Sequence, residues 1–243
     1  MAQTLGFDIS FWQDNNSTPQ MVDFYKAKTN GIRYVFIKAS QANFLDQDFV
    51  MNWSSAKQAG LLRGAYHFLV WNVPVKTQAD YFVSVLRSDP GELPPVLDFE
   101  SRTNAPTKAV AARAAKEFMD IVERGLGKKP ILYTSPGFWR EFGGTEPYWR
   151  DYPLWIAHYT SAAAPTVPAP WTGFTFWQYT SHGDGRKYGT ESLNVDLNWF
   201  NGTEQELYAF AGQTPGPEPT EPTLEEKVDI LWKWYKENVA TKA

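Results

Sequence analysis

Short apolar segments recur between residues 5 and 198, and each is bounded by Gly, Pro, Asn or Ser. Most are rich in β-branched or aromatic residues, the composition expected of strands. Eight segments are predicted to be strands: LGFDIS (5–10), RYVFIKAS (33–40), LRGAYHFL (62–69), PVLDFE (95–100), PILYTS (130–135), PLWIAHY (153–159), FTFWQYT (174–180) and LNVDLN (193–198).

Helical periodicity fills the gaps between the first five strands. The helical segments are residues 18–31, 46–60, 76–87 and 107–127. Strand–helix alternation at a spacing of about 30 residues is typical of a parallel sheet. The alternation then stops, because Pro, Gly and Trp interrupt any helix between 135 and 153, and residues 160–173 cannot form one. We therefore predict an α/β fold, an irregular (β/α)-barrel of eight strands with helices missing in the second half.

The composition changes after Phe210. Residues 1–211 are predicted to form the barrel, and residues 212–223 form a Pro-rich, extended linker. Residues 224–243 are predicted to form an amphipathic helix that begins at a capping box of Thr223 and Glu226. Its apolar face consists of Leu224, Val228, Leu231, Trp232, Tyr235 and Val239. Because such a patch is unfavourable in water, we expect the helix to dock on the barrel or to self-associate.

Composition and charge exclude several classes of protein. A net charge of -4 argues against a nucleic-acid partner, which would need a basic face. The chain has no cysteine and its 3 histidines are scattered, so we expect neither a metal nor a cofactor. No stretch reaches the roughly 18 apolar residues that span a membrane. The first residues lack a secretory signal, so we expect synthesis in the cytoplasm and release by another route, such as lysis.

The stretch PPVLDFE (94–100) places two carboxylates, Asp98 and Glu100, at the end of an apolar strand. Burying an unpaired charge costs several kcal/mol or shifts its pKa. Because alternate residues of a strand face the same way, these two carboxylates are predicted to share one face. They are either a functional pair or the caps of a neighbouring turn or helix.

Other predicted strands also carry polar residues near their ends, where barrel enzymes hold their catalytic groups. The first predicted strand carries Asp8, and the eighth carries Asp196. The first and last strands of a closed barrel are neighbours, so we expect these two carboxylates side by side. Four carboxylates at one mouth repel one another and raise at least one pKa, which keeps an acid catalyst protonated near neutrality.

Eight blocks in this order resemble the glycoside hydrolase family 25 lysozymes, which are N-acetylmuramidases of bacterial, fungal and phage origin. The blocks are GFDISFWQ, YVFIKAS, GAYHF, PPVLDFE, ILYTS, LWIAHY, FWQYTS and NVDLNWF. The resemblance covers residues 5–200 and implies a barrel that lacks helices in its second half. It also implies retaining cleavage of the β-1,4 bond from N-acetylmuramic acid to N-acetylglucosamine.

The resemblance implies roles for the four carboxylates. Glu100 becomes the general acid, and Asp98, Asp8 and Asp196 become its carboxylate companions. The nucleophile is either an aspartate or the substrate's own N-acetyl group, because the distance rule for two carboxylates exempts substrate-assisted enzymes. We favour substrate assistance, with Asp98 orienting the acetamide.

Candidate substrate-binding residues lie on the same strands. Tyr66, Tyr133 and Trp177 either stack on sugar rings or fill the barrel, and adjacent strand residues point oppositely, so not all of them line the site. We favour Tyr66 and Tyr133 over Trp177. Lys38 either contacts a carboxylate of the muramyl lactate or peptide, or pairs with an acidic neighbour.

The leading hypothesis is a peptidoglycan muramidase of the phage endolysin type, with peptidoglycan glycan strands as its partner. The 11 Trp, 12 Tyr and 16 Phe residues agree with a carbohydrate ligand. One alternative is a non-catalytic wall-binding or virion structural protein on the same barrel, although a binding module has no use for clustered negative charge. Another is a hydrolase of a different N-acetylated polymer such as chitin. For the C-terminal helix, envelope binding is the less favoured role.

Overall fold

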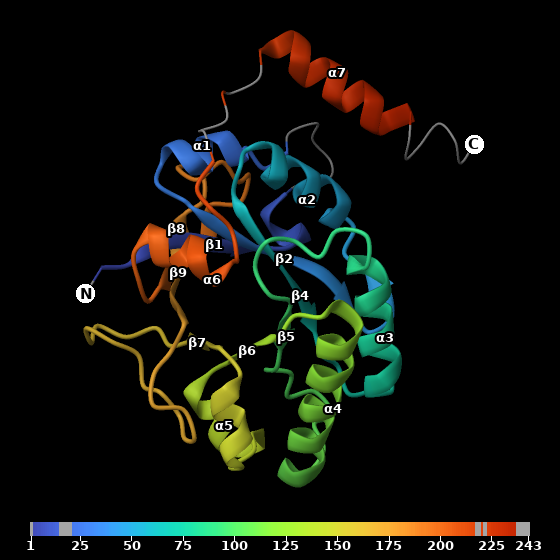
Figure 1. Ribbon diagram of the computed structural model, residues 1–243, viewed down its shortest axis with the longest axis vertical. Helices are drawn as coiled ribbons and strands as arrows, with labels where there is room; N and C mark the ends of the chain where they lie inside the picture. The colour runs from blue at the N-terminus through green and yellow to red at the C-terminus, as the bar shows by residue number, and fades with distance from the viewer. Residues whose placement is uncertain (1, 15–20, 217–219, 221–222, 237–243) are drawn as a thin grey trace.

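A closed barrel forms the centre of the protein in a computed structural model that describes residues 2–14, 21–216, 220 and 223–236 (Figure 1). Within these residues the strands form one mixed sheet. The strands are β1 (Thr4–Ile9), β2 (Tyr34–Gln41), β3 (Phe44–Leu45), β4 (Leu62–Phe68), β5 (Val96–Asp98), β6 (Ile131–Thr134), β7 (Leu154–Ala157), β8 (Phe176–Asp184) and β9 (Asn194–Phe200). All eight predicted strands form, and β3 is an addition that pairs only with β2.

The ring follows the order β1-β9-β8-β7-β6-β5-β4-β2, and pairing between β1 and β2 closes it. The predicted eight-stranded barrel is therefore confirmed. Its neighbouring strands are parallel except that β9 runs antiparallel to both β1 and β8. The reason is the connection: residues 185–193 form a turn between β8 and β9 and not a helix, and such a short connection joins antiparallel strands.

Helices cover the outside of the first half of the barrel, as predicted (Figure 1). They are α1 (Phe24–Thr29), α2 (Phe49–Gln58), α3 (Val75–Leu86) and α4 (Lys108–Leu126). Helix α4 buries Ala111, Ala115, Phe118 and Val122, whose spacing of three to four residues places them on one face. It ends at Gly127, whose φ of 68° is a left-handed conformation that glycine adopts without strain. The first predicted helix starts later than expected, at the cap Asp23; residues 18–20 lie outside the described part.

The second half contains one helix that the sequence analysis excluded. Helix α5 (Pro136–Phe142) lies between β6 and β7 and is followed by the short 3₁₀ helix η2 (Pro147–Asp151). The prediction was wrong here because Pro136 occupies the first helical position, where no N–H is needed, and the Ser135 hydroxyl accepts the N–H of Phe138 at 3.2 Å. Residues 158–175, all described, contain no helix, as predicted.

Aromatic side chains fill the barrel interior below the mouth. The ring of Phe36 stacks on Trp155 at 4.3 Å and meets Phe176 edge-on at 5.0 Å. Gly6 makes room for this packing, since a Cβ there would lie 2.3 Å from the ring of Tyr34. Helix α6 (Glu204–Phe210) adds Phe210, whose ring lies 5.7 Å from that of Phe176. Because this part is packed solid, polar side chains gather at the carboxyl ends of the parallel strands.

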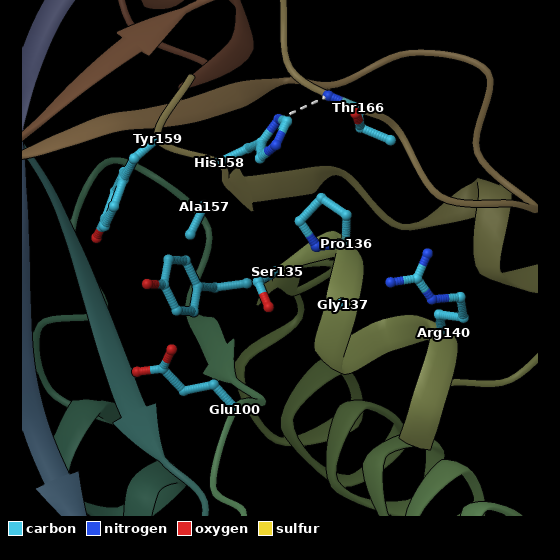
Figure 2. Close-up of a pocket in the computed structure, with 10 residues that line it drawn as sticks. Glu100, Ser135, Pro136, Gly137, Arg140, Ala157, His158, Tyr159 and Thr166 are labelled. Carbon is cyan, nitrogen blue, oxygen red and sulfur yellow. Dashed lines mark hydrogen bonds between the residues drawn. The ribbon is translucent and has the colours of Figure 1, made fainter. Parts of the chain in front are cut away.

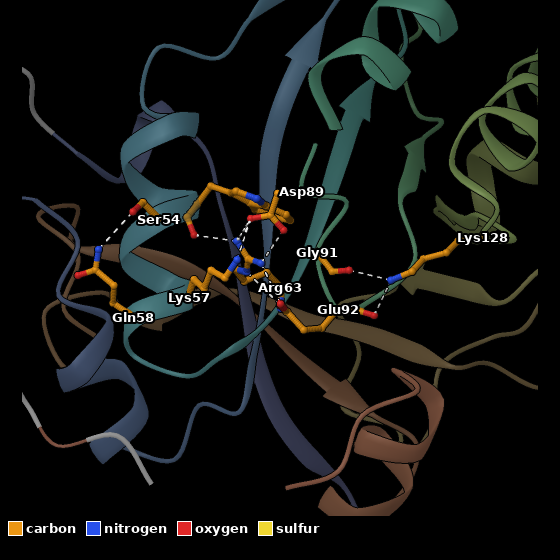
Figure 3. A network of polar contacts seen from close by, with 9 residues as sticks. Ser54, Lys57, Gln58, Arg63, Asp89, Gly91, Glu92 and Lys128 are labelled. Atoms are coloured by element: carbon orange, nitrogen blue, oxygen red, sulfur yellow. Dashed lines mark hydrogen bonds and ion pairs between the residues drawn. The ribbon is translucent and has the colours of Figure 1, made fainter. Parts of the chain in front are cut away.

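A buried arginine holds the opposite end of the barrel (Figure 3). Arg63 on β4 is fully buried and forms ion pairs with Asp89 at 3.0 Å and Glu92 at 2.8 Å. Its guanidinium also lies 4.3 Å from the ring of Trp53. Burial of Asp89 opposes its ionisation, but the hydrogen bonds and charge of Arg63 outweigh that effect and lower the pKa of Asp89 to about 2. This network joins β4 to helix α2 and to the segment that precedes β5.

The C-terminal helix α7 (Leu224–Tyr235) begins at the predicted capping box. The backbone N–H of Thr223 donates to Glu226 Oε2 at 2.8 Å, and the N–H of Glu226 donates to Thr223 Oγ1 at 3.3 Å. Leu224, Val228 and Trp232 are exposed, and Figure 1 shows α7 apart from the barrel, so the structure does not show the expected docking. The side chains of Leu231 and Tyr235, residues 237–243 and linker residues 217–219 and 221–222 lie outside the described part. No described helix is both long and apolar enough to cross a membrane.

Candidate active site

Two of the predicted carboxylates face each other across a strand pair. Asp8 on β1 and Asp196 on β9 are direct partners in the sheet register. The sequence predicted Asp196 near the end of its strand, but it lies near the start of β9. It still reaches the mouth, because β9 runs antiparallel to the other strands of the ring. The expected neighbours are therefore found, by a different geometry.

Asp8 is buried and one of its oxygens is held by two amides. Asp8 Oδ2 accepts hydrogen bonds from Gln178 Nε2 at 2.9 Å and from Asn198 Nδ2 at 2.8 Å. Burial raises the pKa of Asp8 well above its ordinary value, and repulsion from Asp196 acts in the same direction. The two amides fix the orientation of a carboxyl group that ionises with difficulty.

Asp98 and Glu100 reach the same mouth from β5. Val96 and Asp98 point into the barrel. Leu97 and Phe99 point the other way and pack between the barrel and its covering helices, a region that we call the outer core. The strand ends at Asp98, but the Phe99 N–H still donates to the Tyr133 carbonyl at 3.0 Å. The extended backbone therefore continues far enough to carry Glu100 to the rim.

Asp98 is buried and has one oxygen without a hydrogen bond. Among the described residues Asp98 Oδ1 has no partner. Burial raises the pKa of Asp98 well above its ordinary value, repulsion from Glu100 adds to this, and the Lys38 ammonium opposes it. A buried, unpaired carboxyl oxygen costs free energy, so this atom is available to a polar group of a ligand.

Glu100 is the exposed member of the group. Protein atoms crowd it on most sides although solvent reaches its surface, and this loss of solvation raises the pKa of Glu100, with further repulsion from Asp196. Burial also raises the pKa of Asp196 to about 6. We call Asp8, Asp98, Glu100 and Asp196 the carboxylate cluster. Because burial and mutual repulsion both raise the pKa values in the cluster, its members keep their protons to higher pH than isolated carboxyl groups do.

Gln178 connects the cluster to two tyrosines, a role that the sequence analysis missed. Its Nε2 donates to Asp8, and its Oε1 accepts the hydroxyls of Tyr133 at 2.9 Å and Tyr159 at 2.8 Å. A signal was present in FWQYT: Gln178 alternates with Trp177 and Tyr179, so it points into the barrel while those two rings point outward.

The structure separates the predicted substrate-binding residues. Tyr133 and Tyr66 lie inside the barrel, where burial and the nearby carboxylates raise the pKa of both phenols. Lys38 lies near Asp98 and donates to Gln41 Oε1 at 2.8 Å. Trp177 is buried in the outer core, and its Nε1 donates to the His158 carbonyl at 2.8 Å. This buried position does not bring Trp177 to the mouth, and its contact with a sugar stays a prediction.

A pocket of about 510 Å³ opens beside Glu100. It is lined by Glu100, Tyr133, Ser135, Arg140, His158 and Tyr159, among others. Figure 2 shows the Glu100 carboxylate and the Tyr159 hydroxyl directed toward the same side of this space. We call it the Tyr159 pocket. Its volume is within the usual range for small-ligand sites, and its mixture of ring faces and polar atoms suits a sugar.

The site offers acid–base chemistry through carboxyl groups. Among the described residues no group of three His, Cys, Asp or Glu side chains is arranged to hold a metal ion. His67, one of the 3 histidines, is buried and hydrogen-bonded to Ser40 and Gln78, and burial lowers its pKa to about 4. A proton donor with a raised pKa, surrounded by carboxylates, is the arrangement used to cleave acetal bonds.

Replacing Asp196 by Asn should lower activity and move the pH profile. The negative charge of Asp196 raises the pKa of Glu100, so its removal lowers that pKa. An acid catalyst works only when protonated, so the alkaline limb of kcat/KM against pH should move to lower pH. At a pH above that limb, lowering the pKa of Glu100 by about one reduces the fraction of enzyme with a protonated Glu100 about 10-fold.

Asp184→Asn is the matched control, because Asp184 is an exposed carboxylate of the same β8–β9 hairpin. It should leave the profile unchanged. Unchanged rates and an unchanged limb in Asp196→Asn, with the melting temperature retained, would show that Asp196 does not act on Glu100.

Comparisons with known proteins agree with this geometry. The sequence profile described as glycosyl hydrolases family 25 matches residues 7–187. Lysozyme M1 of Streptomyces globisporus is 32% identical over 223 residues, covering 86% of this chain and 71% of that protein. The N,O-diacetylmuramidase of Arthroderma benhamiae is 32% identical over 216 residues, covering 85% of this chain and 86% of that protein. The crystal structure of the bacterial lysozyme from Streptomyces coelicolor has a TM-score of 0.75 and 30% identity, covering 87% of this chain and 98% of that chain.

Proposed function

The chain belongs to glycosyl hydrolase family 25, and we propose that its Glu100 is the general acid in cleavage of the glycan of peptidoglycan. The chain is a glycoside hydrolase with muramidase activity, like its lysozyme and muramidase relatives. The bond cleaved is the β-1,4 linkage from N-acetylmuramic acid to N-acetylglucosamine, the configuration is retained, and the outcome is lysis of the cell wall.

One observation carries the assignment of the acid. Glu100 alone in the carboxylate cluster is exposed and lines the Tyr159 pocket, whereas Asp8 and Asp98 are buried. The leaving oxygen of a polymeric substrate lies in open space between two bulky sugars, so its proton donor must reach outward. Loss of solvation and repulsion from Asp196 raise the pKa of Glu100 and keep its proton available.

The first step is the departure of the leaving sugar. The Glu100 carboxyl donates its proton to the glycosidic oxygen while the bond from that oxygen to C1 of the muramic acid breaks. The electron pair of this bond stays on the oxygen, which becomes a hydroxyl. The positive charge that develops on C1 and the ring oxygen is stabilised by the negative members of the carboxylate cluster.

The second group to act is the acetamide of the same sugar. Its carbonyl oxygen attacks C1 from the opposite face and forms a cyclic intermediate, while Asp98 Oδ1, which has no partner among the described residues, accepts the acetamide N–H. Water then opens the ring at C1, and the Glu100 carboxylate takes the proton of that water. Two inversions give retention.

The proposal is tested on purified cell-wall glycan. Borohydride reduction after digestion should label N-acetylmuramic acid as the new reducing end, and NMR should detect the β-anomer first. A new reducing end of N-acetylglucosamine, or the α-anomer first, would contradict the bond or the retention. Turbidity loss of whole walls measures lysis.

The identity of the nucleophile needs a separate substrate, a glycan whose muramic acid lacks the N-acetyl group. This glycan should be inert if the acetamide is the nucleophile. A covalent glycosyl-aspartate trapped on it would favour an aspartate instead.

Helix α7 is proposed to join copies of the chain. Truncation after Gly212 should then reduce the mass measured by light scattering to that of a monomer, because it removes the helix that carries the exposed side chains of Leu224, Val228 and Trp232. Hydrolysis of soluble glycan fragments should be unchanged. Val228→Asp in the full chain should reproduce the loss of mass, and Glu225→Gln should not. An unchanged mass together with lost binding to whole walls would assign α7 to the envelope instead.

A further inference from the structure

A second cavity, of about 480 Å³, opens on the opposite side of the barrel mouth. It is lined by Phe11, Trp12, Lys38, Gln41, Phe44 and Asp46, among others. We call it the Trp12 cavity. Lys38 belongs to β2, whereas the Tyr159 pocket is built by β6, β7 and the residues that follow them. In the ring, β7 lies four strands from β2, directly across the mouth. The carboxylate cluster therefore lies between the two cavities.

Two exposed aromatic rings form the rim of the Trp12 cavity. Trp12 is 72% exposed and Phe44 is 55% exposed, which leaves large apolar faces in contact with water. The chain around Trp12 is held in place. The Ser10 N–H donates to Gln13 Oε1 at 2.8 Å, the Trp12 N–H donates to Ser10 Oγ at 3.3 Å, and the ring of Phe11 lies 4.3 Å from that of Trp12. The Trp12 ring is therefore a preorganised platform that loses little freedom when a ligand stacks on it.

Polar groups line the inner side of the same cavity. Lys38 Nζ donates to Gln41 Oε1 at 2.8 Å, and Asp46 Oδ2 accepts the Phe11 N–H at 3.4 Å. Lys38 and Asp46 are close enough to attract each other, so the lining of the cavity carries one charge of each sign. A balanced pair of donors and acceptors next to ring faces suits a neutral, hydroxylated ligand better than an anion.

We propose that the Trp12 cavity binds a further sugar of the same glycan strand, on the far side of the cleaved bond from the Tyr159 pocket. The inference rests on the function proposed above. Lys38 Nζ lies 5.3 Å from the centre of the Phe68 ring, and Phe68 is the register partner of Asp98, so the cavity borders the carboxylate cluster and a glycan strand that crosses the mouth can reach both cavities. The enzyme then prefers long glycans to short ones.

The test uses oligomers of wall glycan with defined lengths, from four to eight sugars. Trp12→Ala should lower kcat/KM on the longest oligomer about 10-fold, since removal of a central aromatic anchor costs about that much in affinity, and should leave the shortest nearly unchanged. The change should lie in KM and not in kcat. Trp12→Phe should restore most of the loss, because it keeps a ring face. Tyr148→Ala is the control: this aromatic residue is also exposed, at 37%, but lies on η2 and lines neither cavity.

Calorimetric titration with the longest oligomer gives a second readout that does not need turnover. The parent should bind about 10-fold more tightly than Trp12→Ala. If Trp12→Ala does not fold, Phe44→Ala takes its place with the same expected result. Equal rates and affinities in parent and variant, or equal losses on all oligomers, would overturn the proposal. A parent that binds the long oligomer through Trp12 but cleaves no glycan would overturn the proposed function and leave the cavity assignment intact.

Discussion

Glu100→Gln should reduce the rate of hydrolysis of wall glycan by about 10²–10⁴-fold, the usual contribution of general acid catalysis. Glutamine retains the size of the side chain and its position in the Tyr159 pocket but has no proton of suitable acidity. The leaving sugar alkoxide is a poor leaving group and therefore depends on that proton. The rate is measured as the release of reducing ends, with the melting temperature as a check on folding.

The choice of substrate isolates the role of the proton. An oligomer with an activated aryl leaving group needs little protonation, so its hydrolysis should fall much less in Glu100→Gln. Glu117→Gln is the matched control, because Glu117 is an exposed glutamate on helix α4. Equal losses on both substrates would move the acid role to another residue, with Asp98 the next candidate. A Glu100→Gln variant that clears walls at the parent rate would exclude the proposed mechanism.

Arg63→Met should lower the free energy of unfolding by about 3 kcal/mol, the lower part of the range for breaking a buried ion pair. Methionine fills much of the space but removes the Arg63 ion pairs of Asp89 and Glu92 and the donor to the Trp53 carbonyl at 3.2 Å, leaving Asp89 only its pair with Lys57 at 3.4 Å among the ion pairs of the described residues. The lower value is expected because Asp89 and Glu92 are partly exposed and regain water. Urea unfolding followed by fluorescence measures the difference.

The pH dependence of this difference identifies its cause. The folded-state pKa of Asp89 is lowered from 3.8 to about 2, so its contribution is present above 3.8 and is lost as the pH falls through about 2. The gap between parent and Arg63→Met should narrow over that interval. Arg102→Met is the control, because Arg102 pairs with Glu141 at the surface, where such pairs contribute about 0–1 kcal/mol. A gap that is equally small for both variants would contradict the stabilising role of the Arg63 network.

The sequence predicted the strands well because each strand of this barrel carries its pattern locally. In PPVLDFE the alternation predicted that Asp98 and Glu100 share one face, and the structure brings both to the mouth while Leu97 and Phe99 pack on the other side. The same rule, applied to FWQYT, would have assigned Gln178 to the interior. The candidate taken from that segment was Trp177, the weakest of the three aromatic candidates, although the amide of Gln178 is the group that reaches the carboxylate cluster.

Features that depend on distant parts of the chain were missed. The direction of β9 depends on its pairing with β1, near the other end of the chain, as well as on the short turn at 185–193. Helix α5 forms where Ser135 caps it and its buried Phe138 and Trp139 pack in the outer core, so tertiary contacts outweigh a sequence with poor helix formers. The bonds of Gln178 to Asp8, Tyr133 and Tyr159 join strands that no spacing rule places together.

The pairing of β1 with β9 sets the order in which activity can arise during synthesis. The hydrogen bond from Asn198 to Asp8 joins residues 190 positions apart, and Asp196 meets Asp8 only when β9 enters the ring. A ribosome that has released the first eight strands has produced a chain with an open sheet and an incomplete carboxylate cluster. Because domains are made from the N-terminus onward, we expect the nascent polypeptide to stay inactive until almost the whole barrel has emerged. On the proposed function, a translation stop before β9 should therefore yield a fragment without hydrolase activity.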